Sequence, residues 1–362
     1  MLVPALLIVL GFALLIKGAD FLVDGASNVA KKFHIPEIII GLTIVSIGTS
    51  MPELFVSVTS ALKGCSDMAV GNVIGSNVCN LLLILGLSTV IKSIKFQKET
   101  KYVEIPLCLA FTILFMVLCN SGNDISRVDA IVLLVLFALF IFYTILMGIK
   151  GEASENEHSC NGEKSKNEII DNNEKIIKNE ATDKSEEIAK KEVINSNEEI
   201  DEKQKEKSNS NLIFILKNIL FIIIGVIALK IGGDLTVDNA IIIAKHFNLS
   251  EQVISLTILA VGTSLPELVT SVLAAIKGNS DIAIGNIIGS NIFNMLLIIG
   301  VASLINPIVY NVIYNMDLIV LLVATVVLFL FTMIPPKNEM NRLNGLIYLL
   351  MYGGYLAMLF NV

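Results

Sequence analysis

Long apolar runs, separated by short polar connections, dominate this chain of 362 residues. A helix of about 20 apolar residues is long enough to cross a bilayer. The pattern therefore predicts an all-α membrane protein with ten transmembrane helices. In the first half the expected spans are 2–23, 36–61, 68–91, 103–119 and 128–149, and in the second half they are 212–233, 250–275, 282–305, 316–334 and 343–361.

The two halves repeat one another. A shift of 214 positions places Gly48–Leu54 on Gly262–Leu268 without a gap, and 25 of the 39 positions from Gly48 to Gly86 are then identical. Such self-similarity indicates a duplicated structural unit. Each unit contains five predicted spans, an odd number, so the second unit enters the membrane from the opposite side. We therefore expect two inverted five-helix repeats, 1–149 and 211–362, with a substrate site near the midplane between them.

Composition agrees with a membrane protein, since 54% of the residues are apolar and only 16% are charged, against about 25% charged in soluble domains. The net charge of −7 arises within 151–211, which holds 17 acidic and 10 basic residues. The rest of the chain is neutral, so a nucleic-acid partner is not expected. The five cysteines show no metal-binding spacing,.

The segment 150–210 is rich in Glu, Lys, Asn and Ser and has no aromatic residue. We expect a disordered charged loop, with a regulatory ion-binding module as the alternative. The positive-inside rule indicates that this loop is cytoplasmic and that both termini are outside. We expect the protein to lie in the cell (inner) membrane. The short connections then carry nine basic residues inside (Lys31, Lys32, Lys92, Lys95, Lys98, Lys101, Lys277, Lys337 and Arg342) and three outside (Lys63, Arg127 and Lys245).

The chemistry centres on two carboxylates. Glu53 lies in the middle of a span that is otherwise free of charge, and Glu267 repeats this in the other half. An uncompensated carboxylate at this depth costs about 3 kcal/mol, and no Lys or Arg lies at the same depth in the neighbouring spans. Two carboxylates brought together by a pseudo-twofold axis favour a divalent cation or protons. The alternative is a pair of protonated structural residues.

Polar side chains accompany each glutamate. Pro52 and Pro266 cannot donate to the carbonyl four residues earlier, which predicts a kink that turns backbone oxygens toward the site. Hydroxyl, amide and carboxylate groups then recur every fourth residue along four spans: Thr49, Glu53 and Ser57; Thr263, Glu267 and Ser271; Asn72, Ser76 and Asn80; Asn286, Ser290 and Asn294. Ligands that are all oxygen suit hard cations such as Ca2+ and Na+. Such polar stripes can also hold helices together without binding an ion.

The paired motifs resemble the alpha repeats of the cation/calcium exchanger superfamily, most closely those of prokaryotic sodium/calcium exchangers. These motifs are Gly-Thr-Ser-Met/Leu-Pro-Glu-Leu, followed by Gly-Asn-Val/Ile-Ile-Gly-Ser-Asn. The resemblance implies eight core helices with the first and sixth spans sliding over them. It implies central Ca2+ ligands at Glu53 and Glu267 with the backbone of Thr49 and Thr263, flanking Na+ sites at Ser50, Ser76, Ser264 and Ser290 with the backbone of Ser46 and Ala260, and further central positions at Asn80 and Asn294.

The function expected from these features is exchange of Ca2+ for Na+ by alternating access. Two carboxylates neutralise Ca2+, so a larger load of Na+ would make the exchange electrogenic. Potassium-dependent relatives hold Asp at the position of Asn294, so K+ dependence is not expected. The principal alternative is Ca2+/H+ antiport, and a more distant one is a cation channel. An enzyme is not expected, because the three histidines lie in connections. We expect a monomer in the lipid bilayer, with Ca2+ and Na+ as transported ions and no cofactor.

Overall fold

A computed structural model describes residues 2–33, 35–122, 124–147, 213–236, 260–334 and 338–361, together with isolated positions between 238 and 246. The predicted loop 150–210 and the beginning of the seventh span lie outside these residues. The described chain is almost entirely helical, and its only strands are two-residue segments. The prediction of an all-α membrane protein is therefore confirmed.

The first repeat begins with a long helix and continues into a broken second span. Its elements are α1 (Leu2–Lys32), α2 (Glu37–Ile40), the π-helix η1 (Gly41–Val45), α3 (Ser46–Thr49), α4 (Met51–Leu62), α5 (Ser66–Val78), the π-helix η2 (Cys79–Leu85), α6 (Gly86–Ile91), β1 (Ile94–Lys95), the π-helix η3 (Thr100–Glu104), α7 (Ile105–Ser121), β2 (Asp124–Ile125) and a helix over Arg127–Met147.

The second repeat follows the same order. Its described elements are a helix over Ile213–Thr236, α11 (Ala260–Thr263), α12 (Leu265–Lys277), α13 (Ser280–Phe293), the π-helix η5 (Asn294–Ile298), α14 (Ile299–Ile305), β3 (Ile308–Val309), the 3-10 helix η6 (Val312–Tyr314), α15 (Asn315–Met333), β4 (Glu339–Met340) and α16 (Arg342–Asn361).

Seven of the described helices are long and apolar enough to cross a membrane, and the bent pair Glu37–Thr49 and Met51–Leu62 makes an eighth span. The two remaining predicted spans correspond to α11 with α12 and to α16. The first span extends to Lys32, well beyond the predicted end near residue 23. This extension contains Asp24, Lys31 and Lys32. Their charges interrupt the apolar run, so the hydrophobicity pattern ended the predicted span too early.

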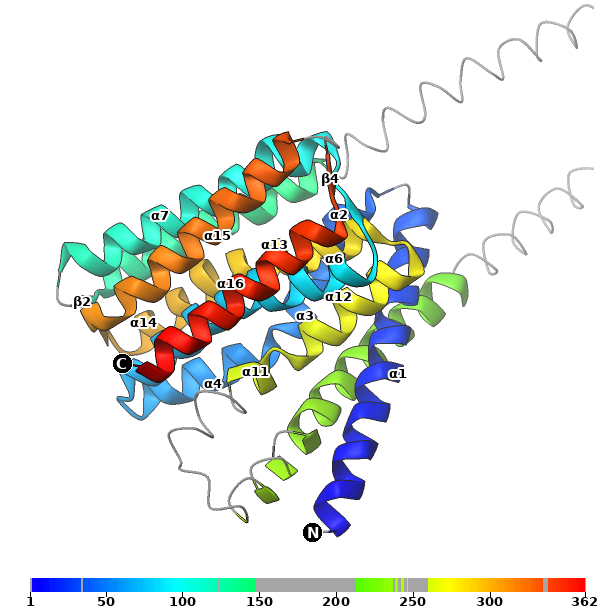
Figure 1. The fold of residues 1–362 in the computed structure, drawn as a ribbon, viewed down its shortest axis with the longest axis horizontal. Helices are drawn as coiled ribbons and strands as arrows, with labels where there is room; N and C mark the ends of the chain where they lie inside the picture. Colours follow the sequence, from blue (N-terminus) through cyan, green and yellow to red (C-terminus); the bar gives the residue numbers. More distant parts are fainter. Residues whose placement is uncertain are drawn as a thin grey trace, which may run out of the picture.

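The third and eighth spans form the centre of the molecule. The continuous helices Ser66–Ile91 and Ser280–Ile305 are the most buried of the seven long apolar helices. Their side chains, among them Leu81, Leu85, Leu296 and Ile299, form the middle of the larger hydrophobic cluster. Figure 1 shows α7 and α15 together on one side of this centre and α16 crossing in front of it, while α1 and the helix over Ile213–Thr236 run side by side along the opposite edge.

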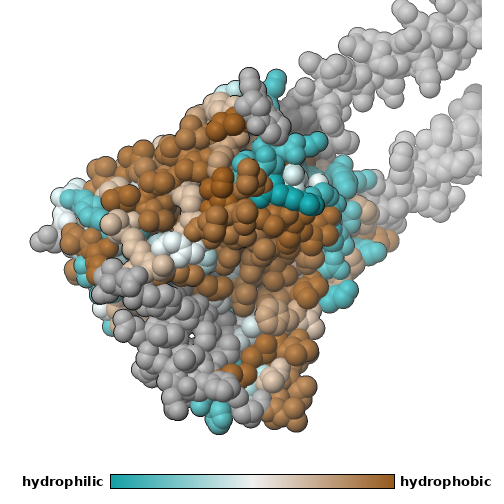
Figure 2. Space-filling model, viewed as in Figure 1, coloured by the Kyte–Doolittle hydropathy of each residue, from teal (hydrophilic) through white to brown (hydrophobic). Residues whose placement is uncertain are grey.

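The outer helices turn apolar side chains outward. Along Arg127–Met147, Val128, Ile131, Val135, Leu139 and Phe142 are all at least half exposed. Figure 2 shows brown apolar surface over α15 and α16, with hydrophilic residues gathered toward the end of the molecule that carries β4. Because the bilayer core solvates such surfaces, exposed apolar residues at helical spacing indicate a lipid-facing belt.

Two small antiparallel sheets join connections from different repeats. At one end β1 pairs with β4 through Ile94 and Met340, and at the other end β2 pairs with β3 through Ile125 and Ile308. The strands β1 and β4 therefore lie at one end of the protein, while β2 and β3 lie at the other end (Figure 1). This grouping agrees with the alternation expected for inverted repeats.

Candidate functional site

Both glutamates lie directly after a break in their helix. In the first repeat α3 ends at Thr49 and α4 starts at Met51, and the two parts of this span meet at an angle of 49°. In the second repeat α11 and α12 are separated at Ser264. Because Pro52 and Pro266 lack the N–H that would continue the hydrogen-bond ladder, each break falls at the predicted position.

The two carboxylates face the hydroxyl groups of the opposite repeat. Ser50 donates a hydrogen bond to Oε1 of Glu267 at 2.9 Å, and Ser264 donates to Oε1 of Glu53 at 3.4 Å. Glu53 and Glu267 are each only 1% exposed. The structure therefore brings four of the predicted residues together in symmetry-related pairs, although they come from two distant parts of the chain.

Asparagines join the third and eighth spans across the pseudo-twofold axis. Asn80 donates to the side-chain oxygen of Asn291 at 3.0 Å, and Asn294 donates to that of Asn77 at 2.9 Å. Asn77 and Asn291 also donate to each other's backbone carbonyl, at 3.2 and 3.3 Å. All four side chains are buried. This closed set of hydrogen bonds fixes the centre of the protein.

Three symmetry-related pairs of buried oxygens at this centre have no hydrogen-bond partner within the described residues. They are Oε2 of Glu53 and Glu267, Oγ of Ser76 and Ser290, and Oδ1 of Asn80 and Asn294. A buried polar atom without a partner costs about 1–3 kcal/mol, so six of them in one place call for an explanation. Carboxylate, hydroxyl and amide oxygens together make a donor set for a hard cation.

The remaining predicted residues have more ordinary contacts. The Ser46 hydroxyl donates to the carbonyl of Leu42 at 2.8 Å, and the Ser46 carbonyl accepts from the backbone of Ser50 at 3.0 Å and from the Thr49 hydroxyl at 3.3 Å. In this conformation the Ser46 carbonyl is thus engaged within its own helix. Thr263 is buried beside the second break, and Ala260 begins α11.

Asn72 and Asn286 form hydrogen bonds with the helices that carry the glutamates. Asn72 donates to the Ser57 hydroxyl at 3.0 Å and to the carbonyl of Glu53 at 3.2 Å. Asn286 donates to the Ser271 hydroxyl at 2.9 Å and accepts a hydrogen bond from Thr49 at 3.0 Å. These contacts join α5 to α4 and α13 to α12 and α3. They do not involve the glutamate carboxylates, which remain available to the serines of the opposite repeat.

Two features of the site were not predicted. The first is the Asn77 and Asn291 pair, although their identity across the repeat was a signal for it. The second is the π-helical backbone at Cys79–Leu85 and Asn294–Ile298, which begins beside Asn80 and at Asn294. A π segment adds a residue to one turn and is frequent at functional sites. Nothing in the apolar pattern distinguishes it from an α-helix.

Comparison with known proteins identifies the family. The family model described as "Sodium/calcium exchanger protein" matches residues 3–146 and 217–361. The chain belongs to this sodium/calcium exchanger family. It is 32% identical to the sodium/calcium exchanger MaX1 of Methanosarcina acetivorans, over 99% of this chain and 98% of that one. It is also 32% identical to the inner membrane protein YrbG of Escherichia coli, over 85% of this chain and 81% of that one.

The fold of this exchanger family is also found among solved structures. A structure of the sodium-calcium exchanger NCX_Mj matches with a TM-score of 0.75 and 28% identity, covering 98% of each chain. The family consists of membrane transporters and not enzymes. The predicted resemblance, the ten-helix inverted-repeat fold and the assignment as a cation/Ca2+ antiporter are therefore confirmed.

Proposed function

We propose that this antiporter exchanges Ca2+ for Na+, and that the oxygens at the centre of the molecule bind both ions in turn. The observation that carries the proposal is the set of six buried oxygens without partners on Glu53, Glu267 and four neighbouring side chains. Removal of these atoms from water is unfavourable unless an ion coordinates them. Both related proteins named as sodium/calcium exchangers above support this choice of ions.

Ca2+ fits the charge of the site. Two carboxylates, those of Glu53 and Glu267, balance one divalent cation. Among the described residues no three or more His, Cys, Asp or Glu side chains converge on a common metal position, so the additional ligands of a bound ion would be hydroxyl, amide and backbone oxygens. We assign the central Ca2+ position to the two glutamates with the backbone of Thr49 and Thr263, and we include Asn80 and Asn294 beside them.

Na+ coupling accounts for the hydroxyl groups. Ser50 and Ser264 donate hydrogen bonds to the two glutamates, and Ser76 and Ser290 carry buried hydroxyls that have no partner among the described residues. We assign these four hydroxyls, with the backbone of Ser46 and Ala260, to the Na+ sites. A proton exchanger needs only the carboxylates, because a proton is carried on a single oxygen. Two carboxylates loaded with more than two Na+ would carry a net positive charge, so the exchange is electrogenic in this proposal.

We also propose the topology that follows from the basic residues: both termini outside, and the loop 150–210 in the cytoplasm between the repeats 1–149 and 211–362. The two small sheets support the grouping of connections on which this rests. We propose a monomer as the transporting unit, because both halves of the site are contributed by one chain.

Uptake of radioactive calcium into proteoliposomes tests the ion assignment. Vesicles loaded with Na+, with K+ or with an imposed proton gradient separate the alternatives, and Glu53→Gln is the inactive control. We expect uptake only from Na+-loaded vesicles, and we expect an imposed membrane voltage to change its rate. Uptake driven by the proton gradient and indifferent to Na+ would overturn Na+ coupling, and a flux that ignores voltage would overturn electrogenic exchange.

A further inference from the structure

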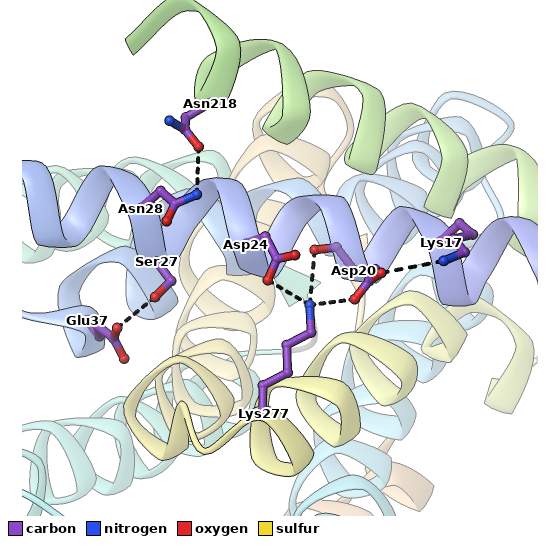
Figure 3. A network of polar contacts seen from close by, with 8 residues as sticks. All are labelled: Lys17, Asp20, Asp24, Ser27, Asn28, Glu37, Asn218 and Lys277. Carbon is purple, nitrogen blue, oxygen red and sulfur yellow. Dashed lines mark hydrogen bonds and ion pairs between the residues drawn. The ribbon is translucent and has the colours of Figure 1, made fainter. Parts of the chain in front are cut away.

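Lys277 ties the long first helix to the core. At the end of α12, its ammonium lies 2.5 Å from Asp20 and 2.7 Å from Asp24 on α1. Figure 3 shows the lysine reaching up between the two aspartates, with Lys17 on the far side of Asp20. The Lys277 side chain is 26% exposed, so water screens these ion pairs only in part.

The inverted repeat contains a second copy of these three residues. The shift of 214 positions places Asp20 on Asp234, Asp24 on Asp238 and Lys63 on Lys277. Because the repeats are inverted, the second set lies toward the opposite face of the membrane. In the structure the second set is apart: Asp234 pairs with Lys230 of its own helix at 2.8 Å, and within the described residues Lys63 forms no ion pair.

The surroundings of the two sets differ in the same way. Around Lys277, the side chains of α12 such as Val269 and Leu273 pack against α1 in a continuous apolar cluster. Phe55, which corresponds to Val269, is instead 58% exposed. It borders one cavity of about 230 Å3 lined by Asp234, Asp238 and Pro266, and another of about 370 Å3 lined by Lys63. The side chains of α12 near Lys277 thus pack against α1, whereas Phe55 and Lys63 line cavities.

The helix α1, which carries Asp20 and Asp24, packs closely against the helix over Ile213–Thr236, which carries Asp234. A Cβ added to Gly18 would lie 2.9 Å from the carbonyl of Gly225, and a Cβ added to Gly225 would lie 2.7 Å from the carbonyl of Gly18. Asn28 also donates to Asn218 at 2.9 Å across the same interface. Such close backbone contact, which only glycine allows, makes α1 and Ile213–Thr236 one rigid unit.

We propose that these six residues form two alternating latches. In the present conformation Lys277 holds Asp20 and Asp24 and closes its face of the transporter. When the rigid pair of helices moves over the core, those ion pairs separate, and Lys63 captures Asp234 and Asp238 on the other face. Each latch stabilises one of the two conformations, which open to opposite faces of the membrane. The relative strength of the two latches therefore determines the populations of these conformations. This inference rests on the alternating-access mechanism of the proposed function and not on which ions are exchanged.

Cysteine pairs test whether both latches form. We would introduce Asp24→Cys with Lys277→Cys, and separately Asp238→Cys with Lys63→Cys, after replacing Cys65 and Cys160 by serine. Oxidation with copper phenanthroline should link each pair in membrane vesicles and slow Ca2+ uptake by at least about tenfold, since a covalently trapped state cannot cycle. A reductant should restore transport. Asp20→Cys with Lys63→Cys, whose members belong to different latches, should not link.

Labelling of Val269, a partly buried position on α12, tests the balance between the two latches. Val269→Cys should react slowly with a membrane-impermeant maleimide applied from the face of Lys277. Adding Lys277→Gln should speed this reaction roughly threefold, the shift expected on losing a part-exposed ion pair. Adding Lys63→Gln should slow it.

The proposal is overturned if the Lys63 and Asp238 positions never link under any ion condition. It is also overturned if both glutamine variants leave the labelling rate unchanged, which would make Lys277 a static tie. These readouts follow conformation and not ion identity. A failure of Na+ coupling would therefore leave them unaffected, and a variant that does not fold is recognised by its gel-filtration profile before labelling.

Discussion

The hydroxyl of Ser50 donates a hydrogen bond to the carboxylate of Glu267 at 2.9 Å, although 217 positions separate the two residues. Its symmetry mate joins Ser264 to Glu53 at 3.4 Å. Each repeat thus orients the carboxylate of the other. A single repeat supplies half of the donor set, and the complete site exists only where the two meet.

Loss of either glutamate charge should strongly weaken Ca2+ binding. Glu53→Gln or Glu267→Gln leaves one carboxylate for a divalent ion, and we expect the apparent affinity for Ca2+ to fall roughly 100-fold, or about 2.8 kcal/mol. Calcium-dependent flux in proteoliposomes measures this effect. Glu37→Gln, a part-buried carboxylate that accepts from Ser27 outside the site, is the matched control and should transport normally. An equal loss of Ca2+ affinity in Glu37→Gln and in the site variants would refute the assignment of Glu53 and Glu267 as Ca2+ ligands.

Removal of the bridging hydroxyls should affect Na+ more than Ca2+. Ser50→Ala and Ser264→Ala each remove one oxygen that flanks a glutamate, and we expect the Na+ concentration for half-maximal exchange to rise several-fold, or about 1 kcal/mol. Concentration dependence of exchange for each ion gives the comparison. Thr325→Val, which removes a buried hydroxyl bonded within its own helix, should change neither. A larger effect on Ca2+ than on Na+ would contradict the proposed division of roles.

The central asparagines should matter for stability. Asn77→Ala leaves the Asn294 amide without its acceptor and the Asn291 carbonyl without its side-chain donor, and each unpaired buried group costs about 1–3 kcal/mol,. We expect a clearly lower melting temperature in detergent, followed by fluorescence-detected gel filtration. Asn120→Ala removes an exposed amide pair with Asn315 and should melt like the unmodified protein. A lower melting temperature for Asn120→Ala than for Asn77→Ala would show that the central hydrogen-bond network does not stabilise the protein.

Close contact between the two long helices should tolerate no side chain. Gly18→Val places carbon atoms against the backbone of Gly225 and Leu229, where a Cβ alone would lie 2.9 Å from each. We expect slowed transport or a destabilised protein, because overpacking of this kind costs about 1–3 kcal/mol. Flux and melting temperature report the two outcomes. Gly353→Ala, with nothing within 4 Å of the added carbon, should be neutral. A neutral Gly18→Val would mean that the two helices can separate.

Potassium should have no influence. Asn80 and Asn294 are both amides, so the site has two carboxylates and no third charge to balance with K+. Replacing K+ by choline on both sides of the vesicle should leave Na+-driven Ca2+ uptake unchanged. A requirement for K+ would indicate a further cation site that the two glutamates do not explain.

The sequence was sufficient for the features that depend on local chemistry and on the repeat. Apolar runs located the ten spans, proline located the breaks before Glu53 and Glu267, and the shift of 214 positions paired the halves. Contacts between distant elements were not predictable. The ion pairs of Lys277 span 253 and 257 positions, and the π-helices at Cys79 and Asn294 reflect a change of backbone register that no residue type dictates.

The hydrogen bonds that join side chains of one repeat to side chains of the other have a consequence for the synthesis of the protein. Asn72 and Ser57 can meet as soon as the first repeat is inserted, but Glu53 and Asn77 must wait for residues more than 200 positions later. At about 5–20 residues per second, that is roughly 10–40 s of translation with polar groups unsatisfied in the membrane. The fragment 1–149 expressed alone should therefore be degraded quickly, and co-expression of 211–362 should protect it. If the lone fragment were long-lived, its polar residues would have to find partners within their own half.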